Sequence, residues 1–189
     1  MIRHSVTAGL LAATVSLPAL GAPVTYAIDS DHTHPAFEFP HMGLSWWRGL
    51  FGKTTGTVTL DRAAKSGSVD IVVDTSTIEF AHKAMNEHAV GEKWFNVAKY
   101  PTATYKGAIK FSGDTPSSLD GQLTLMGVTK PVPLKITQFK CIDHPYYKRE
   151  ACGGEAEGEL NRADFGLTKG ADGDMGKVKL RISVEALKQ

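Results

Sequence analysis

Apolar and polar residues alternate one by one along much of this chain. In the clearest stretch, 177–185, every even position is apolar and every odd position is polar or charged. Because successive side chains of a strand point to opposite faces, this pattern predicts strands with one apolar and one solvated face. The same alternation marks five further segments, at 57–60, 69–74, 102–111, 119–126 and 132–139.

Turn-forming residues separate these segments, at 65–67, 112–114 and 170–173. About eight strands with short antiparallel connections predict an all-β fold, either an up-and-down barrel or a sandwich, and periodicity alone leaves both open. One segment differs. Over 79–95, Phe80, Ala84 and His88 recur at helical spacing, which predicts a short helical insertion outside the barrel or across one end of it.

The chain of 189 residues contains no internal repeat, linker or low-complexity tract, which indicates one domain. Residues 1–21 are typical of a secretory signal peptide, because Arg3 and His4 precede a mostly apolar run, 6–17, that ends in small residues. We expect a mature domain over 22–189 that is exported to the periplasm or secreted. No later segment approaches the roughly 20 apolar residues that a transmembrane helix needs.

The charge balance excludes one class of partner. The formal net charge is +1, and removing the leader with Arg3 leaves 0. A balanced surface gives no broad attraction for nucleic acid or for an anionic membrane. We therefore expect no nucleic-acid partner.

The only two cysteines are Cys141 and Cys152. An even count in an exported protein favours a disulfide, which would close a loop of about a dozen residues and contribute roughly 3 kcal/mol. Two thiols serving as metal ligands are the rival interpretation, but the close C-x-x-C spacing of typical sites is absent. The bridge is expected to staple the long turn 142–151.

Five dispersed motifs resemble, in order and spacing, those of the YceI-like family. They are Tyr26-x-Ile28-Asp29, Trp94-Phe95-Asn96-Val97, Lys99-Tyr100-Pro101, Gly127-Val128-Thr129-Lys130-Pro131 and Arg162-x-Asp164-Phe165-Gly166. The resemblance covers nearly all of the mature chain. It implies a secreted, antiparallel, lipocalin-like barrel that binds a polyisoprenoid lipid, and so favours the barrel over the sandwich.

A closed barrel of eight strands either fills its interior with side chains or holds one small ligand. Periodicity shows an apolar inner face but not whether it is filled, so a packed core remains open on the residues alone. The resemblance implies a channel instead. The side chains expected to line it are Phe37, Phe39, Val58, Leu60, Ile71, Phe95, Tyr105, Ile109, Leu123, Leu125, Leu134, Ile136, Phe165, Leu180 and Ile182.

The implied ligand is a polyprenyl or quinone-like lipid, carried for transport, storage or sequestration. Burial returns about 0.8 kcal/mol per methylene-sized group, so forty carbons would give roughly 30 kcal/mol, beyond the practical ceiling near 20 for non-covalent binding. Burying half of such a tail would therefore suffice for tight binding. No cofactor is expected besides this lipid, and the partner on delivery is expected to be a membrane or a membrane protein, contacted transiently.

Histidines are the candidates for a polar mouth. His34 and His41 resemble the two that bracket the family's first strand, although only six residues separate them here, against about eight in the usual pattern. His88 matches the histidine of an Arg-Asp-x-His-Leu motif, but this chain has lost both the Arg and the Asp. For each histidine, a structural hydrogen bond is the competing interpretation.

Three other functions stay open at this point. His32-x-His34 is half of a zinc or copper site, with His41, His82 or His88 as further ligands, but an alternating pair alone has low specificity. Asp172-Gly173-Asp174 lacks the remaining positions of a calcium loop and is expected to be a polar hairpin. The third is a protein-interaction module, with a packed barrel and an exposed Trp46-Trp47 hairpin. No nucleophile elbow, P-loop, zinc-protease or dinucleotide motif occurs, so we expect no enzyme.

Overall fold

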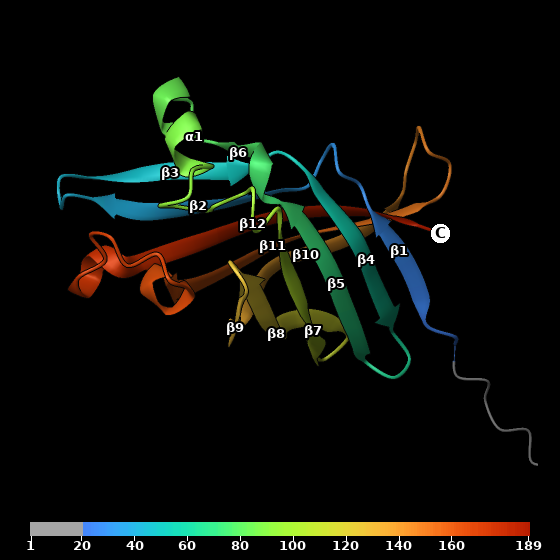
Figure 1. Ribbon diagram of the computed structural model, residues 1–189. Helices are drawn as coiled ribbons and strands as arrows, with labels where there is room; N and C mark the ends of the chain where they lie inside the picture. Colours follow the sequence, from blue (N-terminus) through green and yellow to red (C-terminus); the bar gives the residue numbers. More distant parts are fainter. Residues whose placement is uncertain (1–20) are drawn as a thin grey trace, which may run out of the picture.

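The computed structural model of the chain describes residues 21–189, and antiparallel strands dominate it (Figure 1). The predicted signal peptide, 1–21, lies outside the described residues apart from Gly21. No helix in the described part is long and apolar enough to cross a membrane.

Eight strands form a closed antiparallel barrel, which confirms the predicted fold class. In spatial order they are β1 (Val24–Ile28), β4 (Thr54–Asp61), β5 (Ser66–Asp74), β7 (Thr102–Ser112), β8 (Thr115–Leu125), β10 (Leu134–Asp143), β11 (Glu150–Asn161) and β12 (Lys177–Lys188). The circle closes because β1 pairs with β4 on one side and with β12 on the other. Because the circle is closed, each of the eight strands has a partner strand on both sides, whereas the sheets of a sandwich would have kept edge strands.

A second group of strands extends from β12. The first half of β12, Lys179–Ser183, pairs with β2 (His34–His41), which forms a hairpin with β3 (Ser45–Phe51). The short strand β6 (Ile78–Glu79) pairs with β3, and β9 (Val128–Pro131) forms a hairpin with β8. In Figure 1 the β2–β3 hairpin projects from the barrel beneath helix α1.

The predicted helix over 79–95 is too long, because α1 covers only Lys83–Ala89. Its start is fixed by the His82 side chain, which accepts a hydrogen bond from the Met85 N–H, and by Ala81, whose φ of 55° is incompatible with a helix. Beyond Ala89 the chain continues in turns, so Phe95 lies outside the helix. Of the three residues at helical spacing, Ala84 and His88 lie in α1, whereas Phe80 precedes it.

Three 3₁₀ turns complete the fold: η1 (Thr75–Thr77), η2 (Arg162–Phe165) and η3 (Gly173–Gly176). The segment 172–174, predicted as a polar hairpin, instead opens η3, and two successive 3₁₀ turns connect β11 to β12. The turn expected over 142–151 is shorter, because β10 continues to Asp143 and β11 begins at Glu150.

The strand alternation places one set of side chains inside the barrel. In β12, Val178, Leu180, Ile182, Val184 and Ala186 face the interior, as the even-position pattern predicts. Most strands repeat this arrangement, so the inner face of the barrel is apolar from one end to the other.

Candidate functional site

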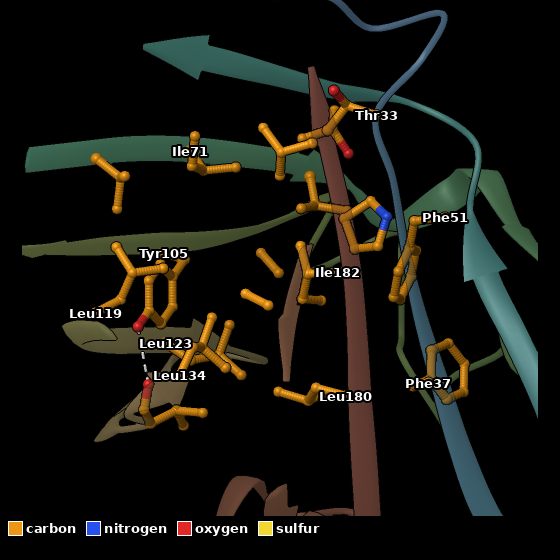
Figure 2. A pocket seen from close by; sticks show the side chains of 18 of the residues that line it. Thr33, Phe37, Phe51, Ile71, Tyr105, Leu119, Leu123, Leu134, Leu180 and Ile182 are labelled. Carbon is orange, nitrogen blue, oxygen red and sulfur yellow. Dashed lines mark hydrogen bonds between the residues drawn. The ribbon is translucent and has the colours of Figure 1, made fainter. Parts of the chain in front are cut away.

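The interior of the barrel contains a cavity walled almost wholly by apolar side chains (Figure 2). All eight barrel strands contribute to its wall, together with β2, β3, α1 and the turn after α1. The centre of a water molecule could reach about 270 Å³ of it. Since one water takes about 30 Å³ in the liquid, the cavity has room for roughly nine water-sized groups. The interior is therefore not a packed core, which removes the main premise of the interaction-module alternative.

Fourteen of the fifteen side chains predicted to line a channel do line this cavity. They are Phe37, Phe39, Val58, Leu60, Ile71, Phe95, Tyr105, Ile109, Leu123, Leu125, Leu134, Ile136, Leu180 and Ile182. The exception is Phe165, which is fully buried in η2 and packs in one core cluster with Leu125 and Leu167. Strand alternation does not extend into a 3₁₀ turn, so Phe165 lies behind the wall.

Sequence reasoning missed several lining residues. Leu119 and Val69 stand in phase with predicted positions of the same strands, so the alternation could have found them. Phe51, Phe80 and Trp94 come from β3 and from connecting segments, where no period of two exists to mark them.

The hydroxyl groups of two wall residues are already paired inside the protein. The Tyr105 hydroxyl donates to the Val132 carbonyl at 2.9 Å (Figure 2), and burial raises the pKa of Tyr105, with a smaller contribution from the Asp120 charge. Thr33 Oγ1 donates to the Glu185 carbonyl at 3.1 Å. Gly121 leaves room for the Tyr105 ring, because a Cβ there would overlap it. These pairs keep the wall apolar.

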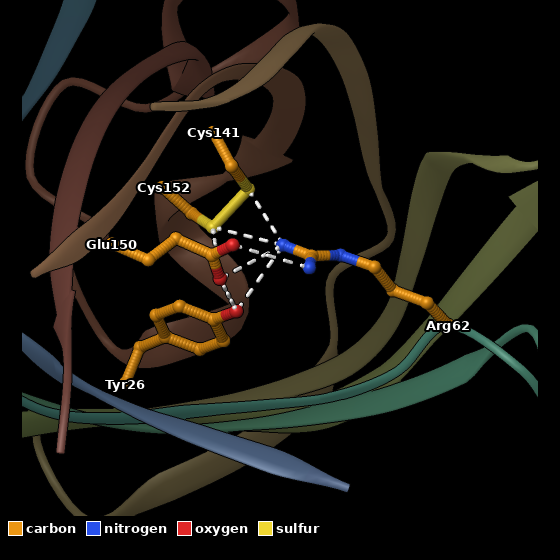
Figure 3. Close-up of a disulfide and its surroundings, with 5 residues drawn as sticks. All are labelled: Tyr26, Arg62, Cys141, Glu150 and Cys152. Atoms are coloured by element: carbon orange, nitrogen blue, oxygen red, sulfur yellow. Dashed lines mark hydrogen bonds and ion pairs between the residues drawn. A yellow bond between two sulfur atoms is a disulfide. The ribbon is translucent and has the colours of Figure 1, made fainter. Parts of the chain in front are cut away.

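A polar cluster lies where Tyr26 and Cys152 reach the cavity (Figure 3). Cys141 and Cys152 face each other across β10 and β11 and form the predicted disulfide. Tyr26, wholly buried, donates to Glu150, and Arg62 Nη2 lies 3.2 Å from both the Tyr26 hydroxyl and Glu150 Oε1.

The ionisation of this cluster is set by its internal hydrogen bonds. Burial, followed by the bond to Glu150, raises the pKa of Tyr26 to about 12. The bond from Tyr26, followed by those from Arg62, lowers the pKa of Glu150. At neutral pH the cluster is a neutral phenol and a guanidinium–carboxylate pair.

A different polar pair lies in the part of the wall formed after α1 and after β11. Arg162, 9% exposed, donates from its Nη atoms to the carbonyls of Leu167, Lys169 and Gly170 at 3.0, 2.9 and 2.6 Å. Its Cζ lies 5.8 Å from the ring centroid of Trp94. Both side chains line the cavity, and burial lowers the pKa of Arg162.

None of the three histidines predicted for a polar mouth lines the cavity. His34 Nε2 lies 3.1 Å from the Asp31 carbonyl oxygen. The His41 ring stacks on the Trp47 ring, with 4.3 Å between the ring centroids, and His88 is exposed beside Trp94. His34 and His41 do stand at the two ends of β2. Their side chains pack away from the cavity.

The structure does not assemble the proposed His32–His34 metal half-site. His32 Nδ1 pairs with Asp29 Oδ2 at 2.9 Å, and the pKa of His32 is raised by this hydrogen bond. Among the described residues, Asp29, His32 and Glu185 have ligating atoms within 4.8 Å of one another, but His34 is not in this group. The exposed His32–Asp29 pair is explained as a surface contact.

The model of the YceI-like domain matches residues 26–186 of the chain. The Protein YceI sequences of Salmonella arizonae and Salmonella enteritidis PT4 are each 35% identical over 168 residues, which cover 87% of this chain and 87% of the relative.

Solved structures share the fold at lower identity. Burkholderia cenocepacia BcnA superposes with a TM-score of 0.66 at 22% identity, covering 84% of this chain and 99% of that one. A polyisoprenoid binding domain from Saccharophagus degradans, implicated in plant cell wall breakdown, gives 0.63 at 14% identity, with coverages of 88% and 99%.

Proposed function

The chain belongs to the YceI-like family, and we propose that it is an exported binding protein which holds a long-chain isoprenoid lipid inside its barrel. The observation that carries the proposal is the apolar cavity walled by all eight barrel strands. The fold likeness to the Saccharophagus degradans polyisoprenoid binding domain supports an isoprenoid over other apolar ligands. The role is carriage, storage or sequestration, without catalysis.

The size of the cavity limits how much of a tail is buried without rearrangement of the wall. Roughly nine groups buried at about 0.8 kcal/mol each give an upper value near 7 kcal/mol, well below the practical ceiling near 20. Ordering the tail and the wall subtracts from this figure. A tail of about two isoprene units fills the cavity, and a longer tail has to widen it or protrude.

The disulfide supports export. Cys141 and Cys152 are bonded to each other, and such bonds persist mainly in oxidising compartments. A periplasmic location accords with this bond and with the predicted leader.

Extraction of the native protein tests the proposal. Protein prepared from periplasm without detergent should release a stoichiometric isoprenoid into organic solvent, identified by mass spectrometry. Emptied protein should bind geranylgeraniol, a C20 alcohol, more tightly than the C10 alcohol geraniol, because the longer tail buries more surface. An empty extract together with no binding of either alcohol would reject the carrier function.

The lipid must come from a membrane, and we propose the tip of the β2–β3 hairpin as the contact. Met42 and Leu44 are 75% and 83% exposed there, beside the indole of Trp46. Lys179 Nζ lies 4.3 Å from the Trp46 ring centroid, and Arg48 on the same hairpin is exposed. Exposed apolar residues, a tryptophan and flanking cations are typical of segments that settle at a bilayer interface.

A transfer assay separates this contact from binding itself. Leu44→Asp should slow uptake of geranylgeraniol from phosphatidylglycerol-containing vesicles several-fold, while uptake from ethanol solution is unchanged. Tyr146→Asp is the matched control, because Tyr146 is 86% exposed in the turn between β10 and β11, at the other end of the molecule (Figure 1). Equal slowing by both variants, or by neither, would contradict a specific role for the hairpin.

A further inference from the structure

Some polar atoms of the cavity wall have hydrogen-bond partners within the protein, and others have none. The hydroxyl groups of Tyr26, Tyr105 and Thr33 are hydrogen-bonded within the protein. Among side chains that line the cavity, three buried polar atoms have no partner: Thr54 Oγ1, Trp94 Nε1 and Arg162 Nε. Buried polar groups without a partner are uncommon in native proteins, and each needs an explanation.

Two of these three atoms belong to neighbouring side chains. The Arg162 guanidinium lies over the Trp94 ring, although the residues come from η2 and from the turn after α1. Both unpaired atoms are N–H groups, which donate and cannot accept. The missing partner of this pair is therefore a hydrogen-bond acceptor.

The charge of Arg162 indicates which kind of acceptor is missing. The Arg162 Nη atoms bond only to backbone carbonyls, and the ion pairs of residues 21–189 do not include this arginine. Arginine stays charged in proteins, and a buried cation normally has an anion as partner. Among the described residues, this wall of the cavity holds a positive charge with no carboxylate against it.

We propose that Arg162 Nε and Trp94 Nε1 bind the polar end of the lipid, and that this end is an anionic oxygen group, a phosphate or a carboxylate. The inference rests on the proposed lipid-binding function and assigns its head group. Phosphate and carboxylate share the required chemistry, since both present charged acceptor oxygens and hydrogen bonds to charged groups are the stronger kind. Both nitrogens are closed off from solvent in the empty protein, so the oxygen reaches them as the ligand displaces neighbouring side chains.

The nitrogen atoms of the Arg162 guanidinium group then have separate roles. The Nη atoms hold the 167–170 segment in place, while Nε is left for the ligand. Replacing Arg162 disturbs both, so Trp94 gives the cleaner variant. Trp94→Phe keeps an aromatic ring against the guanidinium and removes the N–H donor.

The test compares four probes with the same C20 skeleton: geranylgeranyl monophosphate, geranylgeranoic acid, geranylgeraniol and the hydrocarbon phytane. The unmodified protein should bind the two anions at least about tenfold more tightly than geranylgeraniol. Trp94→Phe should reduce that preference by about tenfold, equivalent to about 1.4 kcal/mol, and leave the affinity for phytane unchanged. Trp47→Phe, which removes an indole that does not line the cavity, should leave the preference intact.

A spectroscopic readout separates binding from a loss of packing. In protein labelled with ¹⁵N-tryptophan, the indole N–H signal that Trp94→Phe removes should move on adding the phosphate or the acid, but not on adding phytane. A larger response to the phosphate identifies a phosphate head, and a larger response to the acid a carboxylate.

The outcomes also separate this inference from the carrier function. If all four probes bind equally, or if Trp94→Phe keeps the full preference for anions, the head-group site is wrong and the carrier function stands. If none of the four probes binds, the carrier function itself fails.

Discussion

Ile71→Trp is the sharpest test of a hollow barrel. Ile71 lies in the middle of β5, is only partly buried, and projects into the cavity from a wall strand (Figure 2). Leu125, by contrast, is 8% exposed and belongs to a buried cluster with Ala103 and Leu134. A large side chain at Ile71 therefore enters free space, whereas at Leu125 it would press on packed neighbours.

The magnitude follows from the volume. Tryptophan has about six more non-hydrogen atoms than isoleucine and would occupy about two-thirds of the roughly nine water-sized places in the cavity. A ligand displaced from six places loses at most about 5 kcal/mol at about 0.8 kcal/mol each. Since the tail can shift within the barrel, we expect a loss of about 1.5–3 kcal/mol, a weakening of tenfold to about a hundredfold.

The assay measures both geranylgeraniol affinity and the free energy of unfolding of the empty protein. Weakened binding with a stability change below about 1 kcal/mol confirms the free space. Overpacking of a filled core would instead destabilise the empty protein by about 1–3 kcal/mol. Val72→Trp is the matched control, because Val72 is next to Ile71 in the strand but does not line the cavity. Unchanged affinity in Ile71→Trp would refute the reasoning.

Three further predictions concern stability. Cys141→Ser with Cys152→Ser should lower the free energy of unfolding by roughly 3 kcal/mol in chemical denaturation, the value for a loop of this length. Gly121→Ala should cost about 1–3 kcal/mol, because the new Cβ displaces the Tyr105 ring from its bond to Val132; an unchanged melting temperature would contradict this. In the folded protein the pKa of His32 is raised above its value near 6.5 in the unfolded chain. Protonated His32 therefore stabilises the fold at pH values below about 6.5, and this stabilisation is lost as pH rises through the folded-state pKa. His32→Gln should therefore lower Tm at pH 5.5 and leave it unchanged at pH 9.

The barrel and its inner face were predictable because they depend on a local rule. Alternation in β12 and β5 assigns each side chain to a face without knowledge of its neighbours. Closure of the sheet and the hollow interior were not visible in the pattern, since a filled and an empty barrel alternate alike. The family resemblance supplied that choice, and the cavity is consistent with it.

The polar part of the site could not be predicted from strand patterns. Arg162 and Trp94 stand in turns, where no period assigns a direction, and their unpaired N–H groups depend on which backbone carbonyls the 167–170 segment presents. The family resemblance pointed to three histidines, yet none of them lines the cavity, and His41 stacks on Trp47 instead. Strand position alone does not show which way a histidine side chain packs.

The two polar clusters that touch the cavity differ in this respect, and under the proposed head-group site the difference sets the direction of a bound lipid. In the first cluster the Tyr26 hydroxyl donates to Glu150, and the Arg62 cation is paired with the Glu150 carboxylate. Arg162 retains an unpaired donor and an uncompensated charge. An apolar tail loses nothing beside the first cluster, whereas a charged head gains only beside the second. A lipid with an anionic head therefore has one favourable direction in the barrel, with its head at Arg162 and its tail toward Tyr26.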